Sequence, residues 1–230
     1  MSDLVRWPDL DVSFVSLYLA SDFHMGDGSA RDDFAPHAAR FETSLAAIPK
    51  QDIIVLVGDV VDFWRYDMPQ ILQRYRQVLT MLADRQAIWI AGNHDAGVLK
   101  PFVQQHLPPG FIFTKRLAID GWYACHGDEF DLVNSRWSWI GELATVCVTA
   151  IGHTSPWLED WLSEFPHWIK GTGRHAQASK FRKYAHAFVS DFLVNGIDCR
   201  GIVCGHTHQV AHEPGYVNTG TWATDGWTVL

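Results

Sequence analysis

The sequence is short of positive charge: 18 Lys and Arg residues stand against 26 Asp and Glu, and the formal net charge is -8. A general nucleic-acid-binding protein needs clustered Lys and Arg to neutralise phosphates, so this balance argues against nucleic acid as a partner. Any phosphate that the chain handles must therefore be met locally, and bound cations would do this.

The sequence also lacks a long apolar run. Its nearest approach to the ~20 apolar residues of a membrane-spanning helix is Trp137 to Gly152, and this stretch carries Glu142. The N-terminal segment has acidic residues before its apolar stretch, without the basic region and small-residue cleavage site of a secretory signal. We therefore expect a cytoplasmic protein, for which peripheral contact with the inner membrane surface stays open.

Cysteine is scarce and shows no CxxC pairing, which favours reduced core thiols over disulfides. The four cysteines are Cys125, Cys147, Cys199 and Cys204. A chain of 230 residues with 47% hydrophobic and 19% charged residues can bury a sizeable core. We expect one domain over residues 1–230, elaborated by an insertion.

Short apolar runs rich in β-branched or aromatic residues recur along the chain and predict buried strands. They are Phe14 to Ala20, Ile53 to Val57, Ala87 to Ala91, Trp122 to Cys125 and Gly201 to Cys204, and the tail adds Tyr216 to Asn218 and Trp227 to Leu230. Helical spacing at Ala35 to Ile48 and at Pro69 to Arg85 separates strands in the first half, as in a layered α/β fold.

Residues at about 131–197 break this alternation. They form a mostly helical pattern that carries five of the eleven tryptophans, namely Trp137, Trp139, Trp157, Trp161 and Trp168. We interpret this stretch as a cap inserted into the single domain. The sequence contains no internal repeat that would suggest a different organisation.

Five of the predicted strands end in polar residues and glycine, at the carboxyl ends where ligand sites assemble in open α/β sheets. The segments are Ser21-Asp22-Phe23-His24, Gly58-Asp59-Val60-Val61-Asp62, Gly92-Asn93-His94-Asp95, His126-Gly127-Asp128 and Gly205-His206-Thr207-His208. Strand alternation would point Asp22 and His24 to the same side, as two ligands of one ion require. The two oxygens of Asp59 could bridge two cations.

Each segment also has an ordinary structural interpretation. An Asp before a turn is usually a cap or an Asx-turn, and a lone His is more often a satisfied core residue than a ligand. Five such segments in order, each ending an apolar run, favour a metal site over five coincidences.

Together, Asp22-x-His24, Gly58-Asp59-x-x-Asp62, Gly92-Asn93-His94-Asp95, His126 and Gly205-His206-x-His208 resemble the calcineurin-like metallophosphoesterase family. The resemblance covers residue 17 to about 220, the cap excepted. It implies a four-layer α/β/β/α sandwich with two metals between the sheets. It assigns the first metal to Asp22, His24, Asp59 and His208, and the second to Asp59, Asn93, His126 and His206.

The resemblance also implies a mechanism and a metal. Two divalent cations lower the pKa of a bridging water, and the resulting hydroxide attacks a phosphodiester or diphosphate bond in line. Manganese is favoured by the resemblance, although mixed nitrogen and oxygen ligands also accept Fe, Zn, Co or Ni. His94 is not needed as a ligand and becomes the candidate general acid, with Asp95 fixing its ring. A supporting role is favoured for Asp62 and Asp128.

Within the family, the chain resembles the branch that cleaves UDP-2,3-diacylglucosamine in lipid A biosynthesis. The resemblance rests on Ser21 to Gly26, Gly58 to Trp64 and the helical insertion. The cap offers apolar surface for acyl chains beside cations for a diphosphate. Those cations are Lys170, Arg174, Lys180, Arg182 and Lys183. Candidate substrate-binding residues are Asn93, His206, Arg174, Lys180 and Lys183. The cap tryptophans could equally pack the cap onto the core or onto a second subunit.

Two alternatives remain open at this point. His94 departs from the lipid A branch, in which arginine follows the motif asparagine, and soluble nucleotides or phosphoproteins are then the alternative substrates. A metal-stabilised scaffold without chemistry is a third hypothesis. The full ligand set and His94 argue against it.

Overall fold

The computed structural model describes residues 4–6, 16–130, 182–183, 187 and 199–230. The predicted cap at about 131–197 lies almost wholly outside the described residues, as do Cys147, Arg174 and Lys180. No helix in the described ranges is long and apolar enough to cross a membrane.

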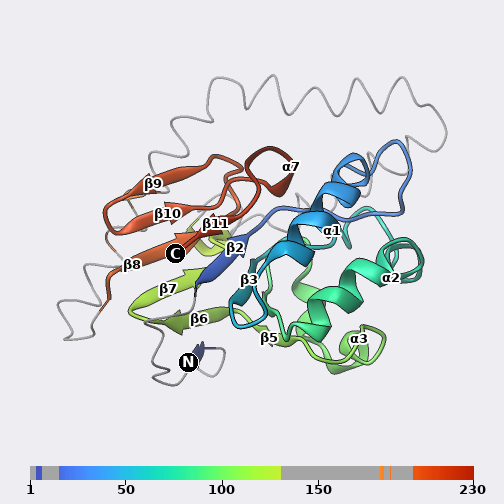
Figure 1. The fold of residues 1–230 in the computed structure, drawn as a ribbon, viewed down its shortest axis with the longest axis horizontal. Coiled ribbons are helices and arrows are strands. Elements are labelled where there is room, and N and C mark those ends of the chain that lie inside the picture. Colours follow the sequence, from blue (N-terminus) through green and yellow to red (C-terminus); the bar gives the residue numbers. More distant parts are fainter. Residues whose placement is uncertain (1–3, 7–15, 131–181, 184–186, 188–198) are drawn as a thin grey trace.

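A five-stranded sheet runs in the order β11-β2-β3-β4-β5 (Figure 1). Its strands are β2 (Leu17–Ala20), β3 (Ile53–Val57), β4 (Ile88–Ile90), β5 (Ile112–Thr114) and β11 (Thr228–Val229). Strands β2 to β5 pair in parallel, whereas β11 joins β2 antiparallel. Because the parallel strands point the same way, the loops after β2, β3 and β4 lie at one edge of the sheet.

A second, six-stranded sheet has the order β1-β6-β7-β8-β10-β9. Its strands are β1 (Leu4–Arg6), β6 (Arg116–Ile119), β7 (Trp122–Cys125), β8 (Gly201–Cys204), β9 (Ala211–Glu213) and β10 (Tyr216–Asn218). Strands β7 and β8 pair in parallel, with Trp122 opposite Gly201. The loops after these two strands therefore also leave the sheet together.

The two sheets pack face to face over an aliphatic core. The five-stranded sheet contributes Leu17, Leu19, Val55, Val57, Ile88 and Ile90, and the six-stranded sheet contributes Leu117, Ile119, Ala124, Val203 and Val217. Burial of each large aliphatic side chain contributes about 1.5–3 kcal/mol, so this interface is a main source of the fold's stability.

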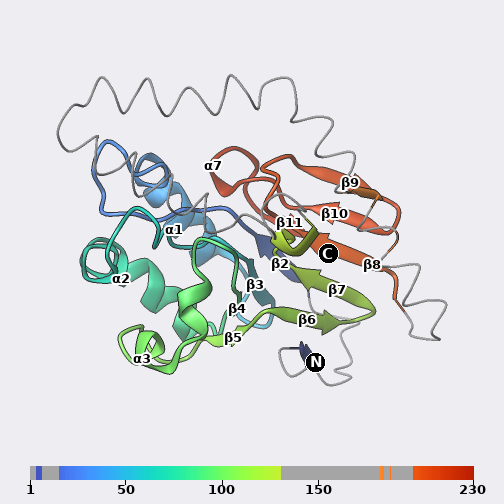
Figure 2. The same ribbon diagram turned by 180° about the vertical axis from the view of Figure 1, so that it is seen from behind.

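Helices cover the other face of the five-stranded sheet (Figures 1 and 2). The main ones are α1 (Ala38–Ala47), preceded by the 3-10 turn η2 (Ala35–His37), and α2 (Met68–Asp84). Shorter elements are η3 (Ala96–Leu99), α3 (Pro101–Gln104), η4 (Asp128–Phe130) and α7 (Trp222–Asp225). Helix α2 begins at a capping box in which Asp67 and Gln70 bind each other's backbone N–H groups. The expectation of a mixed α/β fold with two sheets and flanking helices is confirmed.

The chain crosses between the sheets at a point that the apolar pattern did not indicate. Strand β5 belongs to the five-stranded sheet and β6 to the six-stranded one, with only Lys115 between them. The Thr114 hydroxyl donates to the carbonyl of Arg116 at 2.8 Å and accepts its N–H at 3.2 Å, which holds this bend. A local side-chain bond of this kind leaves no mark in hydrophobic periodicity.

Candidate metal centre

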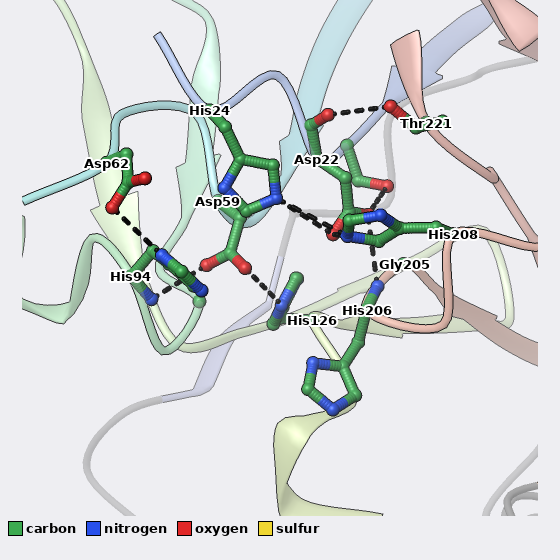
Figure 3. A network of polar contacts seen from close by, with 12 residues as sticks. Asp22, His24, Asp59, Asp62, His94, His126, Gly205, His206, His208 and Thr221 are labelled. Carbon is green, nitrogen blue, oxygen red and sulfur yellow. Dashed lines mark hydrogen bonds and ion pairs between the residues drawn. The ribbon is translucent and has the colours of Figure 1, made fainter. Parts of the chain in front are cut away.

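The loops after β2, β3, β4, β7 and β8 converge where the two sheets meet (Figure 3). Backbone bonds join the first two of these loops, because the N–H groups of Phe23 and His24 donate to the carbonyl of Asp59 at 2.9 and 3.0 Å. The loop after β7 is tied to the loop after β8 by a 2.9 Å bond from Gly205 N–H to the carbonyl of His126. The five predicted segments therefore form one site.

The backbone is strained where the side chains gather. Among the described residues, seven non-glycine residues have positive φ, and five of these are predicted ligands: Asp22 (54°), His24 (49°), Asp59 (52°), His206 (68°) and His208 (55°). Left-handed conformations are unfavourable for such residues and cluster at functional sites. Asp22 and His24 do share one ligand group, but strand alternation is not the reason, because β2 ends at Ala20 and both residues follow it in left-handed backbone conformations.

Two glycines make the close packing feasible. A Cβ atom at Gly92 would collide with the carboxylate of Asp59, and one at Gly58 would collide with the ring of His126. Any other residue would force the ligands apart. The glycines in Gly58-Asp59 and Gly92-Asn93 are thus part of the site, through the space that they leave.

Asp59 lies at the centre of the cluster. Its Oδ1 accepts the N–H of His94 at 2.9 Å, and its Oδ2 lies 3.1 Å from His126 Nε2. The side chain is buried, which works against its charge, yet the imidazoles of His126, His94 and His24 hold the pKa of the Asp59 carboxyl well below its usual range. Asp59 is therefore an anion placed between two groups of imidazoles.

Asp22 organises the other side of the site. Its Oδ2 accepts the Ser21 hydroxyl and, at 3.0 Å, the N–H of His206. Its Oδ1 lies 3.0 Å from His208 Nε2 and 3.9 Å from His24 Nε2. One oxygen is thus held by the protein, and the other faces the two imidazoles.

His126 is fixed in the tautomer that a metal ligand needs. Its Nδ1 lies 2.9 Å from the carbonyl of Val57, so Nδ1–H donates there and Nε2 faces the cluster. Burial would lower the pKa of His126, but the charge of Asp59 holds it well above the ordinary value. In the absence of a cation, a proton on Nε2 would pair with Asp59.

Three groups of side chains could each hold a metal ion, because their ligand atoms lie within 4.8 Å of one another. The groups are Asp22, His24 and His208; His24, Asp59 and His94; and Asp22, Asp59 and His126. The structure thus brings together five of the seven predicted ligands, and it places His94, the predicted general acid, within reach of His24 and Asp59. The overlap of the groups at Asp22, His24 and Asp59 fits a dinuclear site better than three separate ones.

The fit to cations is also tested by polar atoms that are buried without a hydrogen-bond partner. Within the described part of the chain, four buried side-chain atoms make no hydrogen bond, and three are predicted ligand atoms: Asp22 Oδ1, Asn93 Oδ1 and His126 Nε2. Asp22 Oδ1 and His126 Nε2 each face an ionisable side chain, His208 and Asp59 respectively, which are themselves predicted ligands. A buried polar atom without a partner costs about 1–3 kcal/mol. Three of them around one cluster of carboxylates and imidazoles are the donor set of a divalent cation site.

The seventh predicted ligand, His206, takes a different place. Its backbone N–H binds Asp22, and its ring packs edge-to-face against His126 with centroids 5.2 Å apart. The imidazole points away from Asp59 (Figure 3) and belongs to none of the three groups. The structure therefore places His206 beside the group of Asp22, Asp59 and His126, with its ring nitrogens outside that group.

The prediction that Asp95 fixes the His94 ring was wrong, and Asp62 takes that place. His94 Nδ1 lies 3.0 Å from Asp62 Oδ1. Asp95 is fully buried and accepts bonds from Val60 N–H (2.8 Å), Trp89 Nε1–H (2.9 Å) and Gly92 N–H (2.6 Å). Its carboxylate turns back into the core because these donors, from β4 and from the loops after β3 and β4, need an acceptor.

His94 is partly exposed to solvent, with 21% of its side chain accessible. Burial would lower its pKa, but the hydrogen bond to Asp62 and the charge of Asp59 raise it above the ordinary value. With Nδ1 bound to Asp62, the other ring nitrogen, Nε2, is the one that can face a ligand.

Several supporting residues were not predicted. Asn218 donates to the carbonyl of Gly205 at 2.7 Å, and the Thr219 hydroxyl lies 2.6 Å from that of Ser21. The Thr221 hydroxyl donates to the carbonyl of Asp22 at 2.9 Å. The available signal was the run of polar residues at the end of β10 and directly after it.

The predicted substrate-binding cations receive little structural support. Arg174 and Lys180 lie outside the described residues, and Lys183 is helical and exposed. Arg182 forms an ion pair with Glu213 at 2.7 Å. This pairing directs one of the five predicted cations to β9.

Comparison with known proteins places the chain in a family. A model described as calcineurin-like phosphoesterase matches residues 15–210, whereas no curated protein matches the chain. Among solved structures, "The Crystal Structure of the Protein of Unknown Function AQ665 from Aquifex aeolicus" is similar, with 13% identity, 91% of each chain covered and a TM-score of 0.39. The chain belongs to the calcineurin-like phosphoesterase family, whose members typically bind two divalent metals, and it is a hydrolase acting on phosphoric esters.

Proposed function

We propose that this protein hydrolyses a phosphodiester or diphosphate bond with two divalent cations, one held by Asp22, His24, Asp59 and His208 and one by Asp59, Asn93, His126 and His206. The observation that carries the proposal is the cluster of buried ligand atoms on Asp22, Asn93 and His126 that make no hydrogen bond to any described residue. When bound, such cations supply an activated water and offset the charge that develops on the phosphoryl group.

The residues of the chain divide the remaining work. Asp22, His24 and Asp59 each lie in two of the three ligand groups. Asp59 is the bridging candidate by the family resemblance, and one oxygen of Asp22 is already occupied by the Ser21 hydroxyl and the His206 N–H. His206 completes the second site by a rotation of its side chain, since its backbone is already fixed by Asp22. His94, held by Asp62 at Nδ1, protonates the leaving oxygen through Nε2.

A lipid-linked sugar nucleotide such as UDP-2,3-diacylglucosamine is the proposed substrate. Support comes from the likeness of Ser21 to Gly26 and Gly58 to Trp64 to that branch, and from the apolar and basic residues of the cap. We propose manganese as the metal and a cytoplasmic location with peripheral contact to the inner membrane surface. Nucleic acid is not a proposed partner, because the net charge is -8.

Soluble nucleotides or phosphoproteins are the second candidate class. The observation that favours them is His94, where the lipid A branch has arginine, because a histidine that can donate a proton suits a range of leaving groups.

The test begins with metal-stripped protein reloaded in turn with Mn²⁺, Fe²⁺, Zn²⁺, Co²⁺ or Ni²⁺. Each form is assayed on UDP-2,3-diacylglucosamine, on the same sugar nucleotide without acyl chains, and on bis(p-nitrophenyl) phosphate. The proposal expects metal-dependent turnover with preference for the acylated substrate, and the highest rate with Mn²⁺.

The control is the isosteric variant Asp59→Asn, which should be inactive on all three substrates. Equal turnover of the acylated and unacylated compounds would favour the soluble class. Full metal loading without hydrolysis of any phosphoester in a broad panel would instead support a scaffold.

A further inference from the structure

Trp64 lies against the candidate general acid. The indole of Trp64 and the imidazole of His94 are stacked, with ring centroids 4.0 Å apart and planes inclined by 25°. Trp64 is partly buried, and it is not one of the predicted ligands or catalytic residues. A stacked ring of this size covers one whole face of an imidazole.

The loop that carries Trp64 is built onto His94. Asp62 Oδ1 accepts the N–H of Trp64 at 3.1 Å, which is an Asx-turn, and the same oxygen lies 3.0 Å from His94 Nδ1. The next residue, Phe63, donates its N–H to the carbonyl of His94 at 3.3 Å. The Asx-turn thus brings the indole over the imidazole whose edge Asp62 holds.

Each of these contacts removes a different freedom of the His94 ring. The bond from Asp62 fixes the direction of Nδ1, but it leaves the ring able to tilt about the Nδ1···Oδ1 line. The stacked indole limits this tilt on one face. On another side the ring of His24 packs edge-to-face, with centroids 4.7 Å apart and planes at 80°. Together the three contacts aim Nε2 in one direction.

We propose that Trp64 is a positioning residue that holds His94 Nε2 in line with the leaving oxygen. The inference rests on the proposed general-acid role of His94. Misplacement of a reacting group by about 1 Å can cost about 100-fold in rate, so a platform under the ring affects turnover without touching substrate or metal. The effect should fall on kcat and be largest for poor leaving groups, which need the proton most.

The experiment compares the manganese-loaded wild type with Trp64→Leu, Trp64→Phe, His94→Ala and the double variant. The substrates are aryl methyl phosphates with leaving groups of graded pKa. We expect His94→Ala to lose about 100-fold or more on the poorest leaving group. Trp64→Leu should lose about tenfold there, far less on the best leaving group, with KM and metal content unchanged. Trp64→Phe, which keeps an aromatic face, should recover most of the rate.

The double variant separates positioning from general damage to the fold. In the His94→Ala background, Trp64→Leu should cause no further loss, because the group that it positions is gone. Tyr66→Leu is the matched control. Tyr66 lies two residues along the same loop and donates to the carbonyl of Arg31 at 2.9 Å, so its loss should leave the dependence on the leaving group unchanged.

A second measurement does not depend on activity. In spectra of ¹³C-histidine-labelled protein loaded with diamagnetic Zn²⁺, the ring protons of His94, assigned by their loss in His94→Ala, should be shifted upfield by the indole. The shift should disappear in Trp64→Leu and persist in part in Trp64→Phe. An unshifted His94 signal in the wild type overturns the inference, as does an equal loss from Trp64→Leu with and without His94. A wild type without any hydrolysis overturns the proposed function instead.

Discussion

The two sheets contribute to the candidate site in different ways. The five-stranded sheet supplies the buried carboxylates Asp22, Asp59, Asp62 and Asp95, all at most 2% exposed, together with the imidazoles of His24 and His94. The six-stranded sheet supplies imidazoles with a wide range of exposure, from the buried His126 to His208, whose side chain is 50% exposed. The anionic half of the site is thus set into the core. His206 and His208 lie on the loop after β8. The position of this loop depends on a carboxylate of the five-stranded sheet, because the N–H of His206 donates to Asp22.

This difference predicts that the carboxylates control both metals and that the exposed imidazoles control one each. Asp59→Asn should weaken both metals together and lower activity by more than about 100-fold, since loss of even an outer partner of a ligand costs about 10- to 100-fold. His208→Ala should weaken one metal only. Metal content by mass spectrometry, measured across a range of chelator concentrations, tests both variants. Stepwise loss of single metals from Asp59→Asn would contradict the bridging role.

Metal removal should have an effect that depends on pH. Without metal, the raised pKa values of His126 and His208 stabilise the fold below the ordinary histidine range, and this contribution is lost as pH rises through the folded values. The lowered pKa values of Asp22 and Asp59 stabilise the fold above the ordinary carboxyl range. Protons and metals therefore compete for the same imidazoles.

The measurable consequence is the difference in Tm between metal-loaded and stripped protein. This difference should grow from about pH 5.5 to about pH 8. A free metal concentration of about 100 times Kd would stabilise the folded protein by about 2.7 kcal/mol. Differential scanning fluorimetry with and without EDTA provides the measurement. A gap that is constant with pH would show that the imidazoles do not bind the metals.

The carboxylates of the five-stranded sheet should themselves fall into two classes, and isosteric variants separate them. Asp95→Asn places an amide N–H against the N–H of Gly92 and should lower the free energy of unfolding by about 1–3 kcal/mol. Asp62→Asn removes the charge beside His94 and should lower kcat by about 10- to 100-fold with little change in stability. Urea unfolding and kinetics on both variants give the comparison. The reverse pattern would restore Asp95 as the partner of His94.

The smallest effect is expected for Thr221, which follows β10 of the six-stranded sheet and supports Asp22 in the loop after β2. Thr221→Val removes the 2.9 Å bond to the carbonyl of Asp22 and should cost about 1 kcal/mol. Metal affinity should fall only slightly, because Asp22 keeps its bonds to Ser21 and His206. Thr43→Val, at an exposed helix position, is the control for the substitution itself. A large loss of both metals would show that the supporting loop governs the site.

The sequence was sufficient for the parts of the molecule that follow from strand order. Apolar runs ending in Asp, His or Asn predicted the five loops, because the carboxyl ends of parallel strands share an edge. It was insufficient where a turn decides the direction of a side chain. Asp62 and Asp95 flank the site equally in the sequence, and only the burial of three N–H donors around Asp95 distinguishes them. The ring direction of His206 has the same origin, in a left-handed turn.

The left-handed residues also indicate where this protein can be stabilised. Two of the seven, Gln86 (51°) and Asp120 (45°), are not among the predicted site residues. Gln86 follows the end of α2. Its N–H donates to the carbonyl of Ala83, and the N–H of Ala87 donates to the carbonyl of Leu82. Glycine is the preferred residue at the left-handed position of such a helix end. Replacing Gln86 by Gly should therefore gain up to about 1 kcal/mol. Replacing Asp59 by Gly would relieve the same backbone strain but would remove the predicted metal ligand. Stability can therefore be raised without loss of activity only at left-handed positions that hold no metal ligand.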